Sequence, residues 1–256
     1  MENVQTLKAR LENFSFEGND IQKLTEKFQE LAPYFLYDGY IKVRNEFKVF
    51  IRSIEFYFHS EENGIHDPIV YHRNGHGLEH VPYFPTMTLH AHNSGFDITF
   101  EKEGYRVSAL IRAYDVWDGH NYLKWNTDKK MFIVCTSDDC TNTQSTYLYT
   151  LINGFSLGNR NDIVWENEIR EKKMPITSHP RQNVPLYVKL NAENVFEEVT
   201  EDHLKDNSIR AIFDDQIKND PFNRDQVSNP QYFTYNKKRC LKDLKPWQFK
   251  REETFG

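Results

Sequence analysis

Residues 48–58 form the densest run of β-branched and aromatic side chains in the chain, and they predict a buried β-strand. Glu55 stands in the middle of this run. A carboxylate inside an apolar strand is costly to bury unless a cation pairs with it, so it has either a partner or a function. Burial among aromatic rings also raises the pKa of a carboxyl group toward the range in which it acts as a general base.

The matching cation is Arg112, which lies in a second apolar segment at residues 107–113. Two opposite charges in two apolar strands predict one buried site. Strand periodicity places Tyr57 on the same face as Glu55. A carboxylate that activates water, a ring that stacks on a planar leaving group and an arginine that keeps the carboxylate ionised suit hydrolysis of an N-glycosidic bond. The alternative is a purely structural Glu–Arg pair between neighbouring strands.

The segments around these two strands predict an α+β protein. An amphipathic helix is expected at 20–32, ended by Pro33. Further expected elements are strands at 39–44, 86–92, 96–100, 105–113 and 184–190, a tight turn at 63–64, a long loop at 66–85 and a short helix near 146–151. This order favours one domain over residues 1–256, with a curved, mainly antiparallel β-sheet surrounded by helices. Residues 1–18 would be an N-terminal extension and 193–225 an acidic helical insertion.

The overall charge argues against general attraction to nucleic acid, because the net charge is −6 and the pI is near 5.9. The C-terminal stretch is the exception, since basic residues alternate there with aromatic ones. Its candidate contacts to DNA phosphates are Lys237, Lys238, Arg239 and Lys250. The alternative is a solvated terminal segment in which Trp247 and Phe249 pack on the sheet.

Cysteine usage and hydropathy bear on the compartment. The three cysteines, Cys135, Cys140 and Cys240, are an odd number and fit a reducing compartment better than a disulfide framework. The first residues contain no apolar leader, and no run approaches the ~20 apolar residues of a membrane span. We therefore expect a cytoplasmic protein without a membrane partner.

Eight of the ten histidines lie between residues 59 and 120, which raises the alternative of a metal hydrolase. Candidate ligands are His72, His76 and His80 at four-residue spacing, the pair His90 and His92, and the carboxylates Glu79 and Asp97. Two glycines between residues 72 and 80 oppose a helix there, and no helical His-Glu-x-x-His motif occurs. A polar pocket without a metal or a cofactor is therefore favoured.

Five short motifs, in order along the chain, carry a resemblance to a known family. They are Ile54-Glu55-Phe56-Tyr57, Asp67 with His72-Arg73-Asn74, residues 108–113 (Ser-Ala-Leu-Ile-Arg-Ala), residues 150–157 (Thr-Leu-Ile-Asn-Gly-Phe-Ser-Leu) and residues 245–249 (Lys-Pro-Trp-Gln-Phe). Between residues 20 and 250, the chain resembles the alkyladenine (3-methyladenine, methylpurine) DNA glycosylases. That resemblance implies a DNA-binding hydrolase of base-excision repair, which removes an alkylated or modified purine from damaged DNA.

The resemblance also implies site residues. Glu55 would activate the water, and Arg112 would orient the base and the water. Tyr57 and His72 would line the pocket for the flipped base, and His66 competes with His72 because the spacing from Asp67 to His72 is one residue longer than the family pattern. The strand at 89–95 takes the place of the family's tyrosine-rich strand, which makes His90, His92, Asn93 and Ser94 further candidates for substrate binding.

Residues 89–95 contain no aromatic side chain that could fill the gap left by an extruded base. Together with the acidic pI, this departure from the family keeps two alternatives open. One is an N-glycosidase of the same fold that acts on a free nucleotide or nucleoside. The other is a non-catalytic nucleic-acid-binding module.

Overall fold

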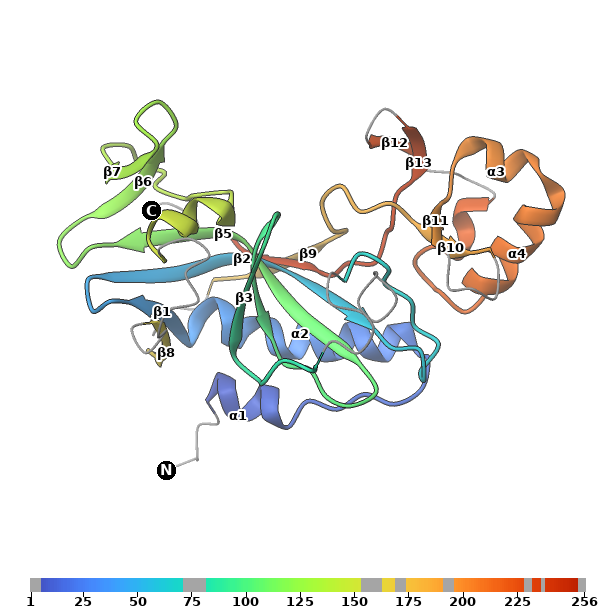
Figure 1. The fold of residues 1–256 in the computed structure, drawn as a ribbon, viewed down its shortest axis with the longest axis horizontal. Helices are drawn as coiled ribbons and strands as arrows, with labels where there is room; N and C mark the ends of the chain where they lie inside the picture. The colour runs from blue at the N-terminus through green and yellow to red at the C-terminus, as the bar shows by residue number, and fades with distance from the viewer. Residues whose placement is uncertain are drawn as a thin grey trace.

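The strand that carries Glu55, β2 (Phe47–His59), is the long central strand of a curled antiparallel sheet that forms a half-barrel (Figure 1). In this computed structural model, the described residues are 6–70, 82–152, 163–168, 174–190, 196–227, 232–235 and 238–252. Within them, β5 (Arg106–Trp117) pairs with β2 along one edge, while β1 (Gly39–Val43) and β14 (Gln248–Arg251) share the other. The predicted α+β fold with a curved, mainly antiparallel sheet is confirmed.

The remaining strands of this sheet extend from both edges of the central group. They are β3 (Thr88–His92), β4 (Gly95–Thr99), β6 (Tyr122–Asn126), β7 (Met131–Val134), β8 (Ile163–Asn167) and β9 (Ile176–His179). The order β3-β4-β5-β2-β1-β8 runs across the sheet, with β9 beyond β14 and the β6–β7 hairpin beside the end of β5. The long loop predicted at 66–85 is without helix or strand at 66–70 and 82–85, and residues 71–81 lie outside the described ranges.

Helix α2 (Ile21–Tyr37) covers one face of the sheet, and the Asp20 side chain caps its first turn by accepting a hydrogen bond from the Lys23 amide (Figure 1). The prediction that Pro33 ends this helix is wrong. Proline removes one backbone donor from the helix, but Phe35 and Leu36 are almost fully buried beyond it. Burial of these side chains offsets the lost hydrogen bond, so the helix continues for another turn.

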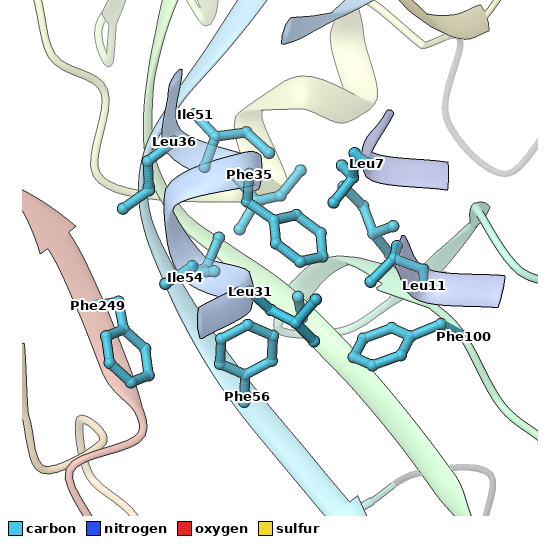
Figure 2. Close-up of a cluster of buried hydrophobic side chains, with 14 of the residues drawn as sticks. Leu7, Leu11, Leu31, Phe35, Leu36, Ile51, Ile54, Phe56, Phe100 and Phe249 are labelled. Atoms are coloured by element: carbon cyan, nitrogen blue, oxygen red, sulfur yellow. The ribbon is translucent and has the colours of Figure 1, made fainter. Parts of the chain in front are cut away.

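Alternation along β2 separates the core from the opposite face of the sheet. Ile54 and Phe56 point toward α2 (Figure 2). There the Phe56 ring stacks on Phe28, with centroids 4.4 Å apart. Helix α1 (Leu7–Glu12) adds the buried side chains Leu7 and Leu11 to the same core. This part of the expected N-terminal extension therefore packs as core.

A second, smaller core lies in the segment that includes the acidic stretch, here called the small lobe (residues 184–190, 196–227, 232–235 and 238–242) (Figure 1). Its elements are β10 (Tyr187–Lys189), β11 (Phe196–Glu198), α3 (Glu201–Lys205), α4 (Asn207–Ile217), the 3₁₀ turn η2 (Arg224–Val227), β12 (Tyr232–Tyr235) and β13 (Lys238–Leu241). In the described part of the acidic stretch, the strand β11 precedes the two helices α3 and α4. Phe213 and Ile217 of α4 pack on Leu186 and Leu241.

The cysteine prediction is wrong in one respect. Cys135 and Cys140, which follow β7, form a disulfide, whereas Cys240 is buried and its thiol donates a hydrogen bond of 3.4 Å to Glu198. The two paired cysteines are only five residues apart, and the bend between them at residues 137–138 brings them together. An odd total of cysteines therefore does not exclude a disulfide between two of them. Among the described residues, no helix is long and apolar enough to cross a membrane.

Candidate active site

A cavity of about 490 Å³ lies between the small lobe and the face of the sheet opposite α2. Strands β2 to β5 and the segment before β10 supply most of its wall. The lining residues are Tyr57, Pro68, Ile69, Val70, His92, Ser94, Asp97, Ser108, Leu110, Arg112, Gln182, Asn183, Val184, Pro185, Tyr187 and Phe196. The lining combines apolar side chains with a few polar and charged groups, which is the usual composition of a small-molecule site.

Glu55 lies behind this wall and is fully buried. The Tyr57 hydroxyl donates a hydrogen bond of 2.8 Å to its Oε2 atom, and the backbone N–H of Gln182 donates one of 2.7 Å to its Oε1 atom. Nε of Arg112 stands 3.6 Å from Oε1. All three of these contact residues line the cavity. As predicted, Glu55 and Arg112 therefore lie together at one buried site, and Tyr57 belongs to the same group of residues.

Arg112 reaches this position from an irregularity in the pairing of β5 with β2. Ser53 pairs with Ala113 and Ile54 with Ile111, so Arg112 is the unpaired residue of a β-bulge. Bulges re-aim a side chain and are frequent beside active sites. The Arg112 Nη2 atom donates a hydrogen bond of 2.7 Å to the Gln182 side chain, and about a quarter of the Arg112 side chain is exposed (24%). No described residue accepts a hydrogen bond from its buried Nε atom.

Tyr57 is held as a neutral donor. Burial and the neighbouring Glu55 carboxylate raise the pKa of Tyr57 well above its ordinary value. The hydroxyl therefore stays protonated at neutral pH and donates a hydrogen bond to Glu55. Its ring carries a second contact, because the guanidinium carbon of Arg181 lies 4.7 Å from the ring centre.

Arg181 is the centre of a buried ionic cluster that sequence reasoning missed. Its guanidinium donates to Asp67 at 2.5 Å and to Asp243 at 2.6 Å, and the residue is 1% exposed. Burial opposes ionisation of Asp243, but the nearby Lys245 and Arg181 outweigh it and hold the pKa of Asp243 well below its usual range. Nothing in the polar sequence around residue 181 marks it as buried, so only the tertiary contacts reveal this cluster.

A second carboxylate, Asp97, lies on the cavity wall and is almost fully buried. The Ser108 hydroxyl donates a hydrogen bond of 3.0 Å to its Oδ2 atom, and Nε2 of His92 lies 3.2 Å from Oδ1. The sequence identified Asp97 only as a conceivable metal ligand. The alternation of Phe96, Asp97 and Ile98 was the available signal, because it turns Asp97 away from the core.

The β3–β4 hairpin that carries His92 and Ser94 is anchored to the 3₁₀ helix η1 (Ser145–Thr150). The Ser145 hydroxyl accepts a hydrogen bond from the Phe96 amide at 3.2 Å. Gly95 has a φ of +138°, and a Cβ atom there would lie 1.7 Å from Ser145 Oγ. Only glycine fits this close approach, so the hairpin is locked against η1 at the rim of the cavity.

The other predicted substrate-binding residues are dispersed. Asn93 is exposed in the β3–β4 turn, and His90 packs against the ring of Phe84 with centroids 4.8 Å apart. His66 does not line the cavity beside Glu55; it lines a second cavity of about 350 Å³ next to α2 and the small lobe. His72 lies outside the described residues.

Of the four predicted phosphate contacts, the structure describes the side chains of two, Arg239 and Lys250. Arg239 lies in the small lobe and forms an ion pair of 3.1 Å with Glu201, and Lys237 and the side chain of Lys238 lie outside the described residues. Lys250 is exposed and pairs with Ser53, two residues along from the Gln248–Glu55 pair, so it shares the face that bears Glu55. Trp247 and Phe249 are 1% and 2% exposed, which confirms that they pack as core.

Within the described residues, the only group that brings three possible ligand atoms within 4.8 Å is His59, Glu61 and His66. His59 Nδ1 accepts a hydrogen bond from the Asp67 amide at 3.1 Å, which leaves the proton of the neutral ring on Nε2. That atom faces Glu61 Oε1 at 3.2 Å. A protonated nitrogen offers no lone pair to a metal, so the arrangement fits a hydrogen-bonded cluster better than a metal centre.

Comparison with known proteins returns no match among family models, curated proteins or solved structures. The geometry of the site is therefore the basis for assigning a function.

Proposed function

We propose that this protein is a metal-independent N-glycosylase of the alkyladenine type, which hydrolyses the N-glycosidic bond of a modified purine nucleotide. One observation carries the proposal: a fully buried carboxylate, Glu55, whose three contact residues line a cavity of about 490 Å³. A carboxylate with only a structural role needs no such cavity beside it.

In the proposed reaction, the bond between the anomeric carbon and the base nitrogen breaks, and its electron pair leaves with the base. The sugar becomes oxocarbenium-like, and the negative charge of Glu55 stabilises it. Glu55 accepts a proton from the water whose oxygen bonds to the anomeric carbon, and that proton then passes to the departing base or to solvent. The free Nε–H donor of Arg112 stands 3.6 Å from Oε1, a spacing at which one water can contact both groups.

The test is the substitution Glu55→Gln, which keeps the shape of the side chain and removes its basicity. We expect release of free base from alkylated DNA, measured by mass spectrometry, to fall by about 10²- to 10⁴-fold. Glu168→Gln is the matched control, because the Glu168 side chain is about half exposed and does not line the cavity. This variant should retain full activity. Retained turnover in the Glu55 variant, with a normal circular dichroism spectrum, would overturn the proposal.

A second candidate is an N-glycosidase that acts on a free nucleotide or nucleoside. The observation that favours it is the engagement of basic groups by carboxylates: Arg239 is paired with Glu201, Lys245 is paired with Asp243 and Asp220, and the net charge is −6. Titration with salt separates the two candidates. A protein that contacts 6–10 phosphates loses about 10³- to 10⁵-fold in DNA affinity between 50 and 200 mM salt, whereas a nucleotide enzyme shows a shallow dependence.

A non-catalytic binding module would bind nucleic acid or nucleotide with equal affinity in the wild type and in Glu55→Gln. It would also release no base from alkylated DNA or from nucleotides. This joint result would replace both enzymatic candidates.

A further inference from the structure

The β6–β7 hairpin concentrates exposed apolar side chains. It projects from the end of β5, at the end of the molecule opposite the small lobe (Figure 1). Six large apolar side chains are exposed in the part of the chain that the structure describes, and three of them, Tyr122, Met131 and Val134, belong to this hairpin. Met131 and Val134 are 52% and 49% exposed. Clustered apolar side chains of this kind mark an interaction surface.

One edge of β7 is open, because β7 pairs only with β6 among the described strands. The Cys135 amide donates a hydrogen bond of 2.8 Å to the Tyr122 carbonyl, just beyond the paired residues of the hairpin. Successive residues of an antiparallel strand direct their backbone groups to alternate sides, so Ile133 also bonds to β6. The N–H and C=O groups of Phe132 and Val134 therefore face outward. No described residue makes a hydrogen bond with these four groups.

The sequence of β7 favours pairing with a copy of itself. The strand contains no charged residue and no proline, the features that usually keep an edge strand from pairing. Its ends differ in charge, since Asp128, Lys129 and Lys130 precede it and Asp138 and Asp139 follow it, all of them exposed. Lys129, Lys130 and Asp138 form no ion pair with any described residue. Antiparallel pairing of two copies brings the net positive end of each strand beside the net negative end of the other.

We infer that β7 is a self-association edge, through which two copies of this chain pair antiparallel about a two-fold axis. With the axis at Ile133, Phe132 of each copy pairs with Val134 of the other copy. Each such pair exchanges two hydrogen bonds, so all the outward backbone groups of both strands are satisfied. Lys130 of one copy then lies diagonally across from Asp138 of the other, within reach of a long side chain. The inference is independent of the proposed function.

Sedimentation velocity of the full chain tests the association. The interface is small, so we expect a monomer–dimer equilibrium with a Kd of about 100 µM, seen as a sedimentation coefficient that rises between about 10 µM and 1 mM. Val134→Pro removes an outward N–H and leaves the bonds to β6 in place, so it should weaken the dimer by about tenfold or more. Val134→Thr keeps the N–H and the branched side chain, and this matched control should dimerise like the wild type.

Charge reversal tests the antiparallel arrangement. Lys130→Glu and Asp138→Lys each place like charges together at both ends of the interface, and each should weaken the dimer by about three- to tenfold at low salt. The double variant exchanges the two charges and should recover the wild-type affinity. Recovery of this kind distinguishes a contact between the two residues from separate damage to the hairpin.

Amide hydrogen exchange, measured by NMR, gives a second readout. The amides of Phe132 and Val134 should exchange about threefold more slowly at about 1 mM protein than at about 50 µM, because pairing covers them. The Ile133 amide, which already faces β6, should show no dependence on concentration.

A wild type that sediments as a monomer at about 1 mM would overturn the inference. A dimer that persists in Val134→Pro would place the contact on another surface and would overturn it equally. Failure of the double charge variant to recover would exclude the antiparallel pairing of β7. If Val134→Pro is not folded by circular dichroism, the charge-reversal variants and the exchange of the three amides decide.

Discussion

Two buried charged clusters meet at Tyr57, and they differ in how completely their charges are paired. The guanidinium of Arg181 lies between two carboxylates, Asp67 and Asp243, at 2.5 and 2.6 Å. Glu55 instead faces the guanidinium of Arg112 at 3.6 Å, beside a cavity. Tyr57 contacts both clusters, because its ring lies against Arg181 and its hydroxyl donates to Glu55.

The difference shows that some buried charged residues stabilise the fold, whereas others are placed to act on a ligand. Short contacts pair Arg181 with two carboxylates, and Asn223 donates a further hydrogen bond of 2.9 Å to Asp243. None of these three ionic residues lines the cavity, although the buried Nε atom of Arg181, like that of Arg112, has no hydrogen-bond partner among the described residues. The cluster ties the loop after β2 to the segment before β14. The Glu55 carboxylate retains acceptor capacity and has a guanidinium donor nearby that is not satisfied. We interpret the first cluster as a structural support for the second.

The largest effect should come from breaking the Arg181 cluster. Arg181→Met leaves Asp67 and Asp243 buried without their cation, so the free energy of unfolding should fall by about 3–5 kcal/mol in urea titrations. Arg112→Met is the matched control and should cost only about 1–2 kcal/mol, because Arg112 is partly exposed and Glu55 keeps two hydrogen bonds. Equal losses in the two variants would remove the distinction between the clusters.

The fall in the free energy of unfolding at low pH should depend on the same Arg181 cluster. The pKa of Asp243 is depressed in the folded state, so its contribution is complete above the unfolded value of about 3.9 and is lost as pH falls below it. The wild type should therefore lose up to about 1.4 kcal/mol of unfolding free energy per pH unit below pH 4 from this group. Urea titrations between pH 2 and 5 measure the slope. Asp243→Asn should be less stable at neutral pH, with a shallower slope, and an unchanged slope would contradict the assignment.

The smallest effect should come from Tyr57→Phe, which tests the junction of the two clusters. The ring and its contact with Arg181 remain, while the hydrogen bond to Glu55 disappears. We expect a loss of about 1 kcal/mol in unfolding free energy and about a tenfold drop in base release. A large loss of stability with unchanged base release would show that the hydroxyl supports the structure only.

Local patterns of apolar and polar residues in the sequence predicted the main strands. The apolar runs at 48–58 and 105–113 became β2 and β5, and the contrast between Glu55 and its apolar neighbours revealed the buried site. Pro33 does not end α2, because burial of Phe35 and Leu36 outweighs the local cost of the proline. In the basic C-terminal stretch, Arg239 pairs with Glu201 and Lys245 with Asp220, and both ion pairs join segments distant in sequence.

The sequence by itself determined the antiparallel architecture and the pairing of Glu55 with Arg112, because strand periodicity and an isolated charge in an apolar run are local signals. The tertiary structure alone decided that Arg181 is buried and that Asp97 meets Ser108 and His92 at the same cavity. The Ser108–Asp97 and Arg181–Asp67 contacts join residues 11 and 114 positions apart, and the energy of burying a charge depends on every neighbour that packs around it.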